Sequence, residues 1–119
     1  MKTLQQKQLE FLNDTVNHFN STNRGITPET LGCSYEHGCA IGRHLDKKLA
    51  MKLDGCGSGY VSEPEVFNEL PEELKELGPH FLARVQSLHD SELNWTEKGL
   101  SKHGEKTVFN IKNDLNLFI

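Results

Sequence analysis

Apolar residues recur at helical spacing in two long stretches of the chain. Over residues 3–19 the apolar side chains share one face, and Gln, Lys and Asn occupy the other: Leu4, Phe11, Leu12, Val16 and Phe19. After Pro79 the same kind of face is formed by Phe81, Leu82, Val85, Leu88 and His89. Because this spacing places one apolar stripe along a helix, it predicts a helix over 3–19 and a second from Pro79 to about Asp90.

A four-residue ladder follows Cys39. It consists of Ile41, Leu45, Leu49 and Leu53. Residues four apart lie on one side of a helix, so the ladder predicts a continuous helix that begins near Cys39. Gly55 would end it.

Capping residues predict three further helical segments. Ser62 precedes Glu65 by three residues, with Pro64 between them, which is a capping-box pattern for a short helix through Leu70. Residues 71–77 form another compact segment, closed by Gly78. The last helix is capped by Thr96 or Ser101 and contains Leu100, Val108, Ile111 and Leu115, with Gly104 in its interior at some cost in helix stability.

These elements predict a mainly α fold. We expect a single compact helical domain over residues 1–119 with five or six short helices, because a chain of 119 residues fits one domain of ordinary size. Two short β-favouring runs bounded by glycines, 33–35 and 60–61, also allow a small two-stranded β element.

Charge and hydropathy exclude some classes of protein. The net charge is −4 and basic residues are spread among acidic ones, which disfavours nucleic-acid binding. No run approaches the roughly 18 apolar residues that a membrane helix needs, and the start MKTLQQKQLEF lacks the apolar stretch of a signal peptide. We therefore expect a cytoplasmic protein that has no membrane partner.

The stretch CSYEHGCAIGRHL and the later Leu-His-Asp segment resemble a family of small, uncharacterised phage and prophage proteins. The matching positions are Cys33, Tyr35, Cys39, Ala40, Ile41, Gly42, His89 and Asp90. The resemblance implies a small protein that works in the cytoplasm of an infected or lysogenic bacterium, and it carries no activity. Arg43 and His44 stand where members of the family have a second cysteine and a proline.

Three cysteines are too few, and odd in number, for a disulfide scaffold. Cys33, Cys39 and Cys56 are therefore expected to be free thiols or metal ligands in a reducing cytosol. Together with His37 and His44 they have the chemistry of zinc ligands, but Cys33 and Cys39 are six positions apart and no second Cys/His pair follows. We predict no metal site, and a zinc-stabilised interaction module stays an alternative.

Catalysis is the second alternative. If Cys39 lies in the first turn of a helix, the helix dipole and nearby imidazoles would lower its thiol pKa. His89 or His37 could then act as the base of a hydrolase or transferase. His89 fits equally well as a core histidine, and no recognised catalytic motif surrounds Cys39.

Ligand binding is the interpretation we favour. Residues 54–60, DGCGSGY, place Gly55, Gly57, Ser58 and Gly59 in a turn whose backbone N–H groups can cradle an anion, although a helix C-cap would look the same. Arg43 and His44 precede this turn, and Tyr35 and Trp95 have the amphipathic character of pocket walls. The Walker and Rossmann patterns are absent, so no cofactor is expected.

The sequence thus predicts a small accessory protein that acts by binding and has no catalytic activity. The expected partner is a host protein or a small anionic ligand, for which a nucleotide derivative is one option. Acidic residues in 68–77 and 90–98 could dock a basic host surface. A homo-oligomer is a further option, because so short a chain leaves much apolar surface outside its core.

Overall fold

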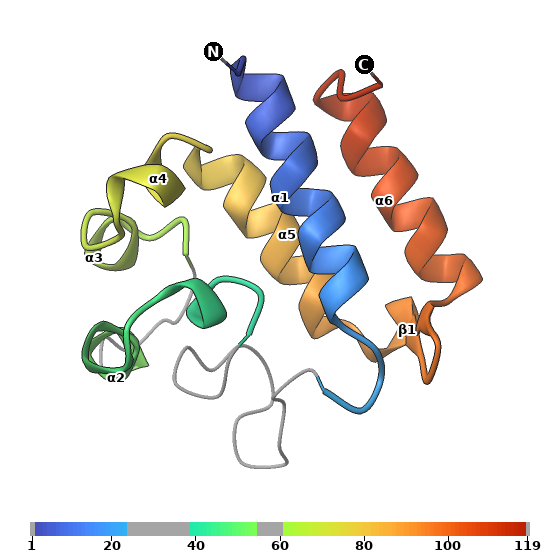
Figure 1. Cartoon of the computed structure of the whole chain (residues 1–119), viewed down its shortest axis with the longest axis horizontal. Coiled ribbons are helices and arrows are strands. Elements are labelled where there is room, and N and C mark those ends of the chain that lie inside the picture. The colour runs from blue at the N-terminus through green and yellow to red at the C-terminus, as the bar shows by residue number, and fades with distance from the viewer. Residues whose placement is uncertain (1, 24–38, 55–60, 119) are drawn as a thin grey trace.

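The computed structural model describes residues 2–23, 39–54 and 61–118, and within these ranges it is mainly α-helical, as predicted (Figure 1). The elements are α1 (Leu4–His18), η1 (Gly42–His44), α2 (Lys47–Asp54), α3 (Pro64–Phe67), α4 (Glu72–Lys75), α5 (Pro79–Asp90), η2 (Glu92–Asn94), β1 (Trp95–Thr96), β2 (Gly99–Leu100) and α6 (Lys102–Asp114). The molecule measures 36 × 35 × 19 Å, so it is about two helices thick.

The first predicted helix is confirmed as α1. Thr3 caps it, because its hydroxyl accepts a hydrogen bond from the Gln6 N–H at 3.1 Å while the Gln6 side chain accepts one from the Thr3 N–H at 2.8 Å. This reciprocal capping box satisfies two donors that a helix start leaves unpaired. Further along α1 the buried Gln8 amide donates to the Leu77 carbonyl at 2.9 Å, which fixes α1 against the turn before α5.

The helix that begins at Pro79 is also confirmed, as α5. Gly78 precedes it with φ of +91°, a conformation that favours glycine. Phe81 of α5 meets Phe11 of α1 edge to face, with ring centroids 6.0 Å apart. Helices α1, α5 and α6 run side by side in Figure 1, and α5 buries more residues than any other element of the described chain.

The prediction of one continuous helix after Cys39 is wrong. The described chain forms the short helix η1, becomes extended at Leu45 and starts again as α2. Asp46 caps the new helix, since its carboxylate accepts a hydrogen bond from the Leu49 N–H at 2.8 Å. Helix α2 ends at Asp54, and Gly55 lies outside the described residues.

The capping box predicted for the next helix does not form. Helix α3 begins at Pro64 with Glu63 at the N-cap and no side-chain capping bond, and it ends at Phe67 instead of continuing to Leu70. Proline at the first helical position has no N–H to satisfy, so it starts the helix without help from Ser62. The compact segment before Gly78 is present as α4.

The last helix begins at the second of its two predicted caps. The Ser101 hydroxyl accepts a hydrogen bond from the Gly104 N–H at 3.0 Å, and α6 follows. The small sheet lies just before it, where Trp95 pairs with Leu100 and Thr96 with Gly99. A small two-stranded β element is thus present, as predicted, but at a different place in the chain: of the residues predicted to form it, only Val61 lies within the described ranges.

Glycine 104 is required for the packing of this region. A Cβ atom built there would lie 2.2 Å from the backbone oxygen of Asn94 in η2. Asn94 is itself buried, and its side chain donates to the Leu88 carbonyl at 2.9 Å and accepts from His103 and Thr107 of α6. The close approach of α6 to η2 therefore explains a glycine that helix propensity alone disfavours.

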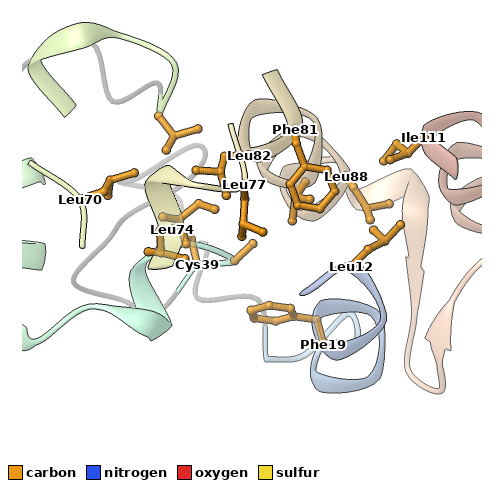
Figure 2. Close-up of a cluster of buried hydrophobic side chains, with 14 of the residues drawn as sticks. Leu12, Phe19, Cys39, Leu70, Leu74, Leu77, Phe81, Leu82, Leu88 and Ile111 are labelled. Atoms are coloured by element: carbon orange, nitrogen blue, oxygen red, sulfur yellow. The ribbon is translucent and has the colours of Figure 1, made fainter. Parts of the chain in front are cut away.

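The hydrophobic core is centred on α5 (Figure 2). On one side Leu88 approaches Leu12 of α1 and Ile111 of α6, and on the other Leu82 lies toward Leu74 and Cys39. Among the described helices, none combines the length and the apolar character needed to cross a membrane.

Candidate functional site

Arg43 is the centre of the candidate site. It lies in η1, where a guanidinium nitrogen contacts a carboxylate oxygen of Asp14 from α1. Its guanidinium carbon sits 5.7 Å from the centroid of the Phe19 ring, a cation–π arrangement. The Arg43 side chain is 19% exposed, whereas that of Asp14 is 59% exposed.

One donor of this guanidinium has no partner within the described part of the chain. The Nε atom of Arg43 is buried and makes no hydrogen bond there. A buried polar group without a partner carries a desolvation penalty that a bound acceptor would relieve. Arg43 is thus held on its face by Phe19 and at one edge by Asp14, with hydrogen-bonding capacity left over.

Two histidines flank Arg43. The Nε2 atom of His44 lies 4.0 Å from the Asp14 carboxylate, and its ring contacts that of Phe11 at 4.9 Å. Burial lowers the pKa of His44 below its usual 6.5, and the Arg43 charge lowers it further, against an opposing effect of Asp14. The pKa of His18 is lowered by the same causes in the same order. We call Arg43, Asp14, His18, His44 and Phe19 the Arg43 site.

The local sequence explains how the site is assembled. Asp14 and His18 are four residues apart on α1, so both project from the same side of the helix. Phe19 follows as the C-cap and turns the chain into an extended conformation. Opposite them, the Arg43 N–H donates to the Cys39 carbonyl at 3.1 Å and so forms the turn that carries Arg43.

One side of His44 is acidic. A groove of about 310 Å³ there is lined by Phe11, His44, Lys7 and three carboxylates, those of Glu10, Glu73 and Glu76. Lys7 is paired with Glu76 at 3.2 Å. An anion would therefore be repelled from this groove.

The lowered histidine pKa values predict how stability depends on pH. An unfolded chain binds a proton at His44 more readily than the folded protein does, so stability is fully present above pH 6.5 and falls as the pH drops below it. Urea unfolding on either side of pH 6.5 should show this loss, and His44→Gln should reduce it. His80→Gln, at an exposed position of α5, is the matched control and should leave the loss unchanged. If His44→Gln does not alter the loss of stability below pH 6.5, His44 is not the group that causes it.

The predicted ligand residues do not all lie together in the structure. Arg43 and His44 do come together. Trp95 is only 5% exposed, and its indole N–H donates to the Leu88 and His89 carbonyls, so it packs against Phe19 in the core instead of forming an open pocket wall. The other predicted ligand residues lie outside the described residues: Tyr35, Gly55, Gly57, Ser58 and Gly59.

The predicted catalytic residues do not present a free thiol. Cys39 is 1% exposed and disulfide-bonded, which corrects the expectation that all three cysteines are thiols or metal ligands. A half-cystine carries no thiolate, so Cys39 cannot be a nucleophile while this bond is intact. His89 is fully buried, with Nδ1 2.8 Å from an Asp90 carboxylate oxygen, which agrees with its interpretation as a core histidine. His37 lies outside the described residues.

The described ranges contain no group of three or more His, Cys, Asp or Glu side chains placed to hold a metal ion. The sequence did not identify Asp14, His18 or Phe19 as residues of a functional site. An acidic residue and a histidine four positions apart on a helix are also common on a solvent-exposed face, so their spacing alone does not indicate a site.

Comparisons with known proteins do not add a relative from which a role for the Arg43 site could be taken. No family model matches the chain, and no match was found among the curated proteins or the solved structures. The interpretation of the site rests on its own residues.

Proposed function

We propose that this protein acts by binding and that its ligand carries an anionic group, a phosphate or carboxylate, which pairs with Arg43. The observation that carries the proposal is the state of the Arg43 side chain. Its charge is mostly buried, its Nε has no partner in the described ranges, and its counter-ion Asp14 is more than half exposed.

The chemistry of arginine suits this role. A guanidinium presents several N–H donors in one plane and can bind a carboxylate or phosphate through two of them at once. Asp14 engages a terminal nitrogen, which leaves Nε as a buried donor for a second acceptor. The Phe19 ring lies close to the guanidinium and adds a cation–π contact.

His18 and His44 would make binding depend on pH. A bound anion stabilises the protonated form of a nearby histidine, so the affinity should rise as the pH falls below 6.5. At higher pH both rings are neutral and Arg43 alone supplies positive charge to the site.

The binding test uses inorganic phosphate, acetate and adenosine monophosphate as probes. Titration calorimetry, together with the NMR signal of the Arg43 Nε–H, should detect binding, and Arg43→Gln should weaken it by about tenfold or more because a charge-assisted hydrogen bond is lost. Arg84→Gln is the matched control, since Arg84 also forms an ion pair on the surface, with Asp114 at 2.6 Å. If none of the probes binds, or if both variants weaken binding equally, the proposal fails.

A cytoplasmic accessory protein of phage origin is the setting we propose for this binding, and the resemblance of residues 31–95 to small phage proteins supports it. The Cys39 disulfide argues against a cytoplasmic setting, because a reducing cytosol normally keeps such cysteines as thiols. Alkylation of thiols in cells tests the compartment: a Cys39 that is trapped as a thiol supports the cytoplasmic setting, and one that is protected as a disulfide overturns it. A host protein is the other partner that we keep, and the acidic side chains of α3 and α4 favour it.

A further inference from the structure

Phe109 on the outer face of α6 and Phe118 in the segment that follows α6 expose two aromatic rings to water. Phe109 is 56% exposed and Phe118 is 55% exposed, and their ring centroids are 5.3 Å apart. The opposite face of the same helix is buried through Gly104, Val108 and Ile111. Adjacent exposed phenylalanines are unfavourable in a monomer and are typical of a contact surface.

Charged residues flank Phe109 in a specific order. Glu105 lies one helical turn before it and Lys112 nearly one turn after it, both displaced to the same side of Phe109 on the helix surface. Lys106 and Asn113 occupy the corresponding positions on the other side. Among the described residues neither Glu105 nor Lys112 takes part in an ion pair, whereas Asp114 is paired with Arg84.

We propose that this face of α6 binds a second copy of the chain, with the two α6 helices antiparallel about a two-fold axis at Phe109. In that arrangement Glu105 of each copy lies beside Lys112 of the other, because positions before and after the axis exchange places. The other side brings Lys106 opposite Asn113, which sets no like charges together. Phe109 meets its own counterpart, and Phe118 extends the apolar contact.

A parallel arrangement of the same helices is less complementary in charge. Its two-fold axis would exchange the two sides of Phe109, so Glu105 would lie near both Glu105 and Lys106 of the partner copy, and Lys112 near Lys112 and Asn113 with no opposite charge. The antiparallel arrangement is self-complementary, as a two-fold contact requires. This complementarity identifies a second copy, in preference to an unrelated protein, as the occupant.

The experiment is sedimentation equilibrium of the full chain over a wide range of protein concentrations. We expect a monomer–dimer equilibrium in the wild-type protein. Glu105→Lys or Lys112→Glu alone should weaken association by about tenfold, because each creates two repulsive contacts in place of two attractive ones. The double variant, which carries both substitutions, should recover association to within about threefold of wild type.

The double variant separates this contact from effects inside one helix. Both substitutions oppose the helix dipole, since one places a cation near the start of α6 and the other an anion near its end. An effect confined to the monomer would therefore make the double variant the worst of the three. Recovery of association supports the proposal, and failure to recover overturns it.

The aromatic pair provides the second measurement. Replacement of both Phe109 and Phe118 by Ser should leave the fold intact, since both rings are exposed, and should abolish the dimer. Circular dichroism checks the fold. A wild-type protein that stays monomeric at every concentration, or a dimer that persists in this variant, overturns the assignment of the surface.

Discussion

Replacing Gly104 with Ala should destabilise the protein by about 3 kcal/mol. Alanine is the better helix former by about 1 kcal/mol, so an effect in this direction cannot come from helix propensity. It comes from the backbone oxygen of Asn94, which lies 2.2 Å from where the new methyl group would be. Backbone cannot rotate aside as a flexible side chain can, so α6 and η2 must separate and strain the hydrogen bonds of Asn94.

Urea unfolding followed by circular dichroism measures this effect. Asn110→Ala is the matched control, because Asn110 is exposed in the middle of the same helix, and there the substitution should stabilise slightly. A Gly104→Ala variant as stable as the wild type would show that α6 does not approach η2 as closely as the structure has it.

Reduction of the Cys39 disulfide should lower the free energy of unfolding by about 2–4 kcal/mol. Cys39 is 1% exposed and lies just before η1, and a disulfide restricts the unfolded chain once it is closed. Unfolding with and without a reductant measures the difference. Denatured, unreduced protein should show one reactive thiol among its three cysteines.

Serine variants identify the partner of Cys39. Cys33 and Cys56 are the other two cysteines of the chain, so one of the variants Cys33→Ser and Cys56→Ser should unfold like the reduced protein and the other like the oxidised one. Three reactive thiols in the unreduced protein would contradict the disulfide and would return Cys39 to the group of candidate nucleophiles.

The long helices were predictable because their signal is local. A stripe such as that of Leu12 in α1 or of Leu82 and Leu88 in α5 needs one buried face and nothing else, and periodicity reports such a face directly. A single capping residue predicted the helix start correctly where no other residue could begin the helix, as with Ser101 before α6. Ser62 does not act as a cap, because Pro64 starts α3 without a side-chain hydrogen bond.

The elements that sequence reasoning missed depend on contacts between distant segments or on very few residues. The ladder from Ile41 to Leu53 keeps its spacing across the extended residue Leu45, so periodicity cannot reveal the break that the Asp46 cap makes. The hairpin after η2 has two residues per strand, which is too short for an alternating pattern.

Only some residues of the candidate site could be identified from the sequence. Arg43 and His44 were identified as ligand residues from their chemistry and from the helix expected around them. Asp14 lies 29 positions away in sequence from Arg43, and only the packing of η1 against α1 brings the two together. Trp95 is buried in the core, and sequence alone does not decide its place because an amphipathic ring suits a pocket wall and a core equally well.

The network around Asn94 also bears on the order in which the protein folds. It joins α5, η2, the hairpin and α6, segments that follow one another directly along the chain, so closing it requires only short loops. Helix α1, in contrast, is joined to the turn before α5 by residues 69 positions apart in sequence, so that contact closes a much longer loop. The C-terminal third thus has the local contacts of a folding nucleus, and we expect docking of α1, which completes the Arg43 site, to follow it.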